Sequence, residues 1–104
     1  MAEEVFLELN EIFHVKARLG IMTLLLSFEE LDFNGLKLKL GLTDGNLGAH
    51  LRVLEDAGYI ELIKGYVSRR PHTTCKITEQ GREAFQNYLK QLEAVIQMAR
   101  YEKE

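Results

Sequence analysis

The stretch 42–60 constrains the fold of this chain more than any other part. It has the pattern of one amphipathic helix with both ends marked. Thr43 is an N-cap residue, whose hydroxyl accepts from an N–H of the first turn, and Gly58 suits a left-handed C-terminal cap. Between them, leucines recur at i, i+4 and i+7, which predicts one buried face: Leu47, Leu51 and Leu54. We therefore predict a helix over 43–57, followed by a strand that begins at Tyr59.

A shorter helix is predicted just before this one. Residues 33–40 (FNGLKLKL) are apolar at helical spacing, Asp32 can cap their start, and Gly41 ends them. Two helices joined by a short turn with a glycine form a helix-turn-helix, whose second helix enters a nucleic-acid groove. Upstream, the pattern predicts a first core helix over 14–28 and a connector over 27–32.

A hairpin is predicted after the second helix. Residues 59–63 and 72–77 have the composition of strands, and the loop 64–71 between them holds the chain's one proline. This loop is longer than a tight turn requires, so we expect it to protrude as a basic wing. Residues 59–78 hold four cations against one acid, a net charge of +3, in a chain whose total is −3. A basic segment on an acidic body fits a local phosphate contact; a solvated basic loop is the alternative.

Two apolar stripes flank this region. The N-terminal stripe lies on a predicted helix within 1–13 and includes Val5, Leu9 and Phe13. The C-terminal stripe lies on a long helix over 79–102 that Thr78 caps, and it includes Phe85, Leu89, Leu92 and Ile96. This helix would be about 35 Å long, more than a domain of this size needs. We expect the stripes to form a homodimer interface; the alternative is that both fold back on their own domain.

Several segments, in this order, resemble the core of winged helix-turn-helix regulators, nearest to the MarR-like and ArsR-like groups. They are 40–43 (LGLT), Leu47, 50–52 (HLR), 54–55 (LE), 58–60 (GYI) and 78–82 (TEQGR). The resemblance covers roughly 12–85, most of the chain. It implies a mostly α (α+β) fold with a two-stranded wing, and a transcriptional regulator that binds double-stranded DNA. The length of 104 residues predicts a single domain, 1–104, and the long last helix favours a homodimer.

The resemblance also implies which residues approach DNA. On the recognition helix they are Thr43, Asp44, Gly45, Gly48, Ala49 and Arg52, and helical spacing puts Asn46 at the edge of the same face. On the wing, the basic residues Lys64, Arg69 and Arg70 themselves favour a DNA contact, because arginine suits a narrow minor groove. The helix departs from the family pattern, which favours Ser, Gln, Arg or Lys on this face. Each glycine costs the helix about 1 kcal/mol, and either close approach to DNA or a merely tolerated surface glycine accounts for it. We expect phosphate contacts to dominate and sequence discrimination to be modest.

Other functions find less support in the sequence. The acidic net charge and the bare recognition helix favour, as the alternative, a winged-helix module that binds proteins and not DNA. No paired carboxylates with a histidine, nucleophile triad or phosphate-binding glycine loop appears, so we expect no enzyme and no cofactor. With one cysteine and His14, His50 and His72 scattered, no metal site is predicted. A small-molecule effector would act by changing the spacing of the recognition helices, but the sequence identifies no pocket for one.

Cys75 is the basis of a third hypothesis, a redox or metal sensor. Oxidant sensing needs an accessible thiol of lowered pKa, and Cys75 lies in a predicted strand on the face of Thr73 and Ile77, so structural packing is favoured. The amino terminus lacks the features of a signal peptide, and no apolar run approaches the length of a membrane span. We therefore expect a cytoplasmic protein that does not enter a membrane.

Overall fold

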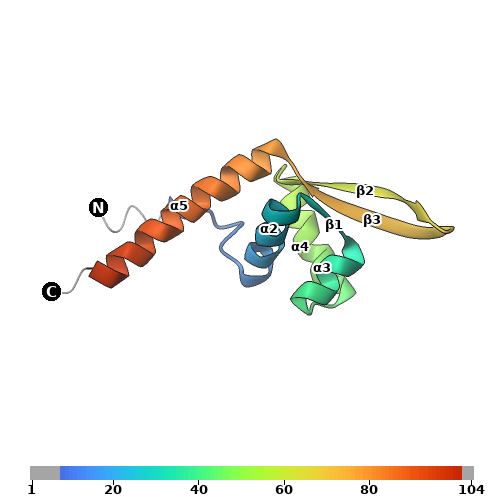
Figure 1. Cartoon of the computed structure of the whole chain (residues 1–104), viewed down its shortest axis with the longest axis horizontal. Coiled ribbons are helices and arrows are strands. Elements are labelled where there is room, and N and C mark those ends of the chain that lie inside the picture. Colours follow the sequence, from blue (N-terminus) through green and yellow to red (C-terminus); the bar gives the residue numbers. More distant parts are fainter. Residues whose placement is uncertain (1–7, 102–104) are drawn as a thin grey trace.

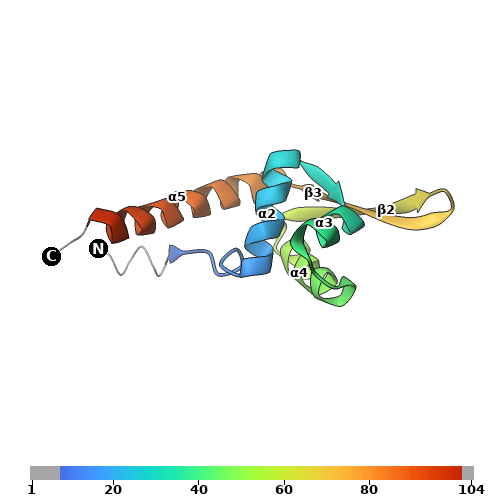
Figure 2. The same ribbon diagram turned by 60° about the horizontal axis from the view of Figure 1, so that its bottom comes forward.

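The computed structural model describes residues 8–101 of the chain. Its helices are α2 (Lys16–Phe28), α3 (Phe33–Leu40), α4 (Asp44–Asp56) and α5 (Glu79–Tyr101), and its strands are β1 (Glu30–Asp32), β2 (Ile60–Val67) and β3 (Arg70–Ile77). The helices α2, α3 and α4 pack beneath one end of the sheet (Figure 1). The hairpin β2–β3 and the helix α5 project from this body in opposite directions, as both views show (Figure 2). This is the predicted mostly helical winged helix-turn-helix fold.

The sheet has three strands where the sequence predicted two. They are antiparallel in the order β1-β3-β2. The added strand β1 lies in the segment predicted as a connector, and it pairs Leu31 with Cys75 of β3. Three residues are too few to show the alternating pattern of a strand. This strand forms by pairing with β3, which lies more than forty residues further along the chain.

The hairpin is longer and its turn tighter than predicted. The strands pair continuously from Ile60 with Ile77 to Val67 with Arg70, so the predicted loop over 64–71 is wrong. Only Ser68 and Arg69 form the turn, with φ angles of 53° and 69°. Positive φ at both central residues is the geometry of a type I′ turn, which matches the twist of the strands. Such turns usually carry Asn-Gly, so Ser-Arg gave no signal.

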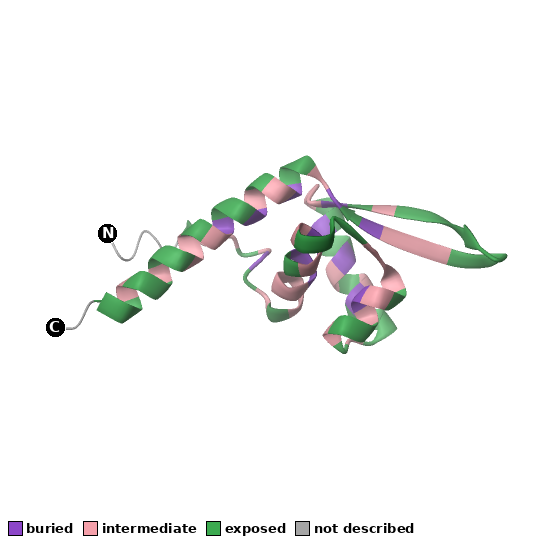
Figure 3. Ribbon diagram, viewed as in Figure 1, coloured by how far each residue is buried: buried purple, intermediate pink, exposed green. Residues whose placement is uncertain are grey.

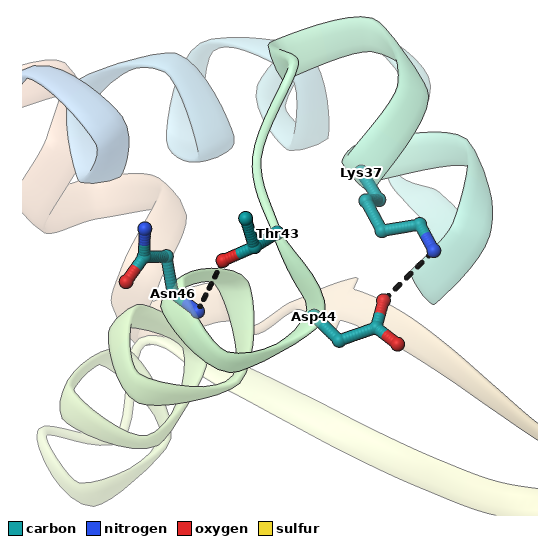
Figure 4. Close-up of polar contacts among 4 residues, drawn as sticks. All are labelled: Lys37, Thr43, Asp44 and Asn46. Carbon is teal, nitrogen blue, oxygen red and sulfur yellow. Dashed lines mark hydrogen bonds and ion pairs between the residues drawn. The ribbon is translucent and has the colours of Figure 1, made fainter.

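The helix-turn-helix has the predicted caps. The Asp32 carboxylate accepts from the Gly35 N–H at 2.7 Å and begins α3, while the Thr43 hydroxyl accepts from the Asn46 N–H at 3.1 Å and begins α4 (Figure 4). Gly41 and Gly58, at φ 67° and 85°, follow the two helices in the left-handed region. The first core helix, α2, begins two residues later than predicted.

The core lies where the three short helices meet the sheet and the start of α5. It contains the predicted leucines of α4, with the fully buried Phe13, Phe85 and Cys75 (Figure 3). Of the predicted N-terminal helix, residues 1–7 with Val5 lie outside the described residues, and 9–13 are a bend and a turn. The Asn10 carboxamide oxygen makes this turn by accepting from the N–H groups of Ile12 at 2.8 Å and Phe13 at 3.4 Å.

Three elements meet at the start of α5, where Thr78 ties them together. Its hydroxyl donates to the Gly58 carbonyl at 2.7 Å and accepts from the Gly81 N–H at 2.9 Å. Its own N–H donates to the Tyr59 carbonyl at 3.1 Å. The end of α4, the start of β2 and the first turn of α5 are therefore held in one joint.

Candidate nucleic-acid interface

The exposed face of α4 carries the predicted recognition residues. Because Leu47, Leu51 and Leu54 are buried, the opposite side of the helix faces away from the core. The structure leaves Gly48 half-buried on that helix and exposes the cap residue Thr43 together with Asp44, Gly45, Asn46, Ala49 and Arg52. Most side chains on this face of the helix are therefore small or absent, and Arg52 is its one cation.

Asp44 lies in the first turn of α4 but does not cap the helix. Thr43 is the N-cap, and the Asp44 carboxylate forms an ion pair with the Lys37 ammonium of α3 at 2.8 Å (Figure 4). The Asp44 side chain is 74% exposed, so the pair adds little stability. Its effect is to offset the one acid in the first turn of the recognition helix.

The two glycines of this face are not required by packing inside the chain. A Cβ atom on Gly45 or on Gly48 would have no neighbouring heavy atom within 4 Å. Alanine would therefore fit at either position in the free protein and would favour the helix. No contact among the described residues therefore explains why these two positions are glycine.

The wing carries its cations at two places. Arg69 and Arg70 are exposed at the tip of the hairpin, and Lys64 is exposed halfway along β2. Side chains alternate along a strand, so Lys64 lies on the same face as Leu62, which packs against the core. The structure thus brings Lys64 toward α4 and keeps the two arginines apart from it.

A groove separates α4 from the hairpin. Its volume is about 370 Å³, and its lining includes the apolar residues Phe33, Leu51 and Leu62. We call it the α4–wing groove; its walls include Gly48, Arg52, Glu55, Asp56, Lys64 and Thr73. Sequence reasoning had placed Gly48, Arg52 and Lys64 at a DNA site but missed the other three. The signal available for Glu55 was its spacing of three from Arg52, which places both on one side of a helix.

The comparisons with known proteins bear on what this arrangement does. Residues 17–96 match the family described as "Winged helix DNA-binding domain". The chain belongs to this family. It is thus a winged-helix DNA-binding regulator and not an enzyme.

Individual relatives agree with this assignment. The chain is 47% identical over 79 residues to an uncharacterized protein of Methanocaldococcus jannaschii. The aligned region covers 76% of this chain and 86% of that protein. The solved structure of a transcriptional regulator homologue from Pyrococcus horikoshii OT3 is 37% identical with a TM-score of 0.81, over 91% of this chain and 92% of that one. An ArsR family transcriptional regulator has the same fold at 18% identity, with a TM-score of 0.58, over 91% of this chain and 93% of that one.

The histidine of the recognition helix has a structural contact. Nη1 of Arg18 in α2 lies 3.2 Å from Nδ1 of His50, and because a guanidinium only donates, the imidazole nitrogen accepts. Arg18 also donates through Nε to the Ile12 carbonyl at 2.6 Å. Across residues 8–101, no group of three or more His, Cys, Asp or Glu side chains is placed to hold a metal ion.

The single cysteine of this winged-helix chain is a core residue. Cys75 is fully buried, and burial, followed by the charges of Asp32 and Glu55, raises the pKa of its thiol from 9.0 to about 11. An oxidant-sensing cysteine needs the opposite, an accessible thiolate. This location favours the packing role that we preferred from the sequence.

The predicted dimer residues divide into two groups. Phe13 and Phe85 are fully buried and pack edge to face with ring centroids 5.1 Å apart, so they belong to the core of their own chain. Leu9, Leu89 and Leu92 are half-buried, and Ile96 is 45% exposed. The C-terminal part of α5 extends away from α2, α3 and α4 (Figure 1). None of the helices in the described part of the chain is long and apolar enough to cross a membrane.

Proposed function

We propose that this regulator binds duplex DNA as a homodimer, with α4 in the major groove and the hairpin on the flanking minor groove or backbone. One observation carries the proposal: Arg52 of α4 and Lys64 of β2 line the same groove, so helix and wing offer their cations on one face. Arg69 and Arg70 add two exposed cations at the tip of the hairpin, outside this groove. Arginine suits a narrow minor groove, where the negative potential is enhanced.

The test is a titration of random-sequence duplex DNA by fluorescence anisotropy at two salt concentrations. We expect binding that weakens steeply as salt rises, because released counterions supply most of its free energy. The double variant Arg69→Ala/Arg70→Ala should bind more weakly, and its salt slope should be lower by about 4 for the dimer, since each of the two subunits loses two cations. Lys90→Ala/Arg100→Ala, which removes the same charge from α5, is the matched control and should keep the slope. Absence of binding at low salt would favour the protein-interaction module.

The homodimer rests on the far half of α5. Val95 is half-buried and Ile96 is 45% exposed on a helix that leaves its own domain, and a second copy would cover them. Pairing of two such helices would set the distance between two recognition helices, which must match successive major grooves about 34–36 Å apart. A small-molecule effector that alters this distance would regulate binding.

The dimer is tested by mass in solution. Ile96→Glu puts a charge into the proposed interface at a position that the single chain leaves exposed, so the domain should stay folded and the mass should fall to that of a monomer. Gln97→Glu adds the same charge to the neighbouring exposed position and should leave the dimer intact. A monomeric mass for the unchanged protein at micromolar concentration would contradict the proposal.

A further inference from the structure

The charged residues of the α4–wing groove are distributed unevenly along its length. Gly48 comes first along α4, Arg52 follows about 6 Å further along the axis, and Glu55 about 4.5 Å beyond that, beside Asp56. On the opposite wall, Lys64 of β2 pairs with Thr73 of β3, so an ammonium and a hydroxyl lie next to each other. The groove therefore has an open cationic half and an acidic half.

The dipole of α4 reinforces this asymmetry. The acidic half lies in the last turn of α4, where unpaired carbonyl groups also repel an anion, whereas Gly48 and Arg52 lie further from that end. No basic residue occupies that last turn, and the ion pairs found among the described residues leave Glu55 and Asp56 without a cationic partner. A phosphate is thus attracted at one end of the groove and repelled at the other.

We propose that the groove holds the sugar–phosphate backbone of one DNA strand in its cationic half, and that Glu55 and Asp56 fix the strand's position by repelling phosphate from the other half. Arg52, Lys64 and Thr73 are the donors, and Gly48 leaves the wall open for the backbone to approach. This inference rests on the proposed DNA binding and adds two acidic residues that restrict it. Repulsion of misplaced phosphate is a means of discrimination that needs no base contact.

The decisive variant is Glu55→Gln/Asp56→Asn, assayed on random-sequence duplex DNA at two salt concentrations. Removing the repulsion should tighten binding by about three- to tenfold at low salt and steepen the salt dependence. The matched control Glu83→Gln/Glu93→Gln makes the same change in net charge on α5, which runs away from the hairpin (Figure 1). It should change affinity by less than about twofold, because charges beyond roughly 10 Å are screened. An equal gain in both variants, or none in the first, overturns the inference.

Gly48→Ala tests the other half of the groove. The added methyl group meets no atom of the free protein, so the melting temperature should stay the same or rise. Binding should weaken by about tenfold, because the methyl group would occupy space that the DNA backbone needs. Unchanged affinity shows that no strand enters the groove. If the unchanged protein itself does not bind duplex DNA, the proposed function fails, and that result is distinct from either variant outcome.

Discussion

The first turn of α5 lies directly against the carbonyl group of Tyr59: a Cβ atom on Gly81 would be 2.0 Å from the Tyr59 oxygen. No side chain fits there, because the obstacle is backbone that also accepts the Thr78 N–H. Gly81→Ala should therefore force α5 away from the start of β2 and lower the free energy of unfolding by about 3 kcal/mol or more, measured by urea denaturation. Gly45→Ala is the same chemical change at an open helix position and should raise stability by up to about 1 kcal/mol. Equal effects would contradict this account of the joint.

The wing turn holds two residues in a conformation that neither favours. Asn is enriched at positive φ, so Ser68→Asn should stabilise the hairpin by about 0.5–1 kcal/mol without loss of DNA affinity. Arg69→Gly should stabilise the turn similarly but lower the salt slope of DNA binding by about 2 for the proposed dimer, since it removes one phosphate contact from each subunit. Thermal melts and anisotropy titrations on both variants separate the two effects. A full salt slope for Arg69→Gly would remove this arginine from the interface.

Thr43 illustrates how a predicted DNA contact can also be a structural residue. Its hydroxyl satisfies an N–H at the start of α4, so Thr43→Ala should cost about 1 kcal/mol of unfolding free energy. Thr43→Ser keeps the hydroxyl and should restore stability. If the serine variant is as unstable as the alanine variant, the methyl group and not the cap supports the helix.

Burial of the Cys75 thiol gives the stability of the domain a pH dependence. The pKa is about 11 in the folded chain against 9.0 for the ordinary thiol, so the unfolded chain loses its proton first. The free energy of unfolding should therefore fall as pH rises from about 9 to about 11, by at most roughly 2–3 kcal/mol from this group, and should be unaffected by it below pH 9. Cys75→Ala should lower stability at neutral pH but flatten the decline measured by denaturation at each pH. An equal decline in the variant would assign it to other groups.

The sequence was sufficient for features that adjacent residues determine. The helix ends could be predicted within one or two residues from capping side chains such as Thr43 and Thr78, and from the leucine spacing of α4 with the glycine after it. These interactions span a single helical turn, so adjacent residues determine them. The strand β1 could not be found in this way, since its partner lies far along the chain. Nor could the length of the hairpin, which depended on Ser68 and Arg69 adopting positive φ without glycine.

The candidate site was predictable in part for a related reason. Position on a helix indicated that Arg52 is exposed, and composition indicated a basic wing, but only the fold brings Arg52 and Lys64 into one groove with Glu55. Apolar spacing likewise did not distinguish a core residue from a partner contact. Phe85 and Ile96 belong to one stripe on α5, yet the first is fully buried and the second is 45% exposed.

Because Thr78 fixes the start of α5 to the rest of the domain, a small rotation there would move the far end of this helix through a larger distance. The helix is 23 residues long, so about 34 Å separate its pivot at the wing from its far end. If α5 rotated by about 5° about Thr78, its C-terminal end would move by about 3 Å. Conversely, a shift of about 3 Å where two such helices meet would turn each recognition helix by about 5°. In the proposed homodimer, the close contact of Gly81 with the Tyr59 backbone would therefore transmit a movement of the paired helices to the DNA-binding face.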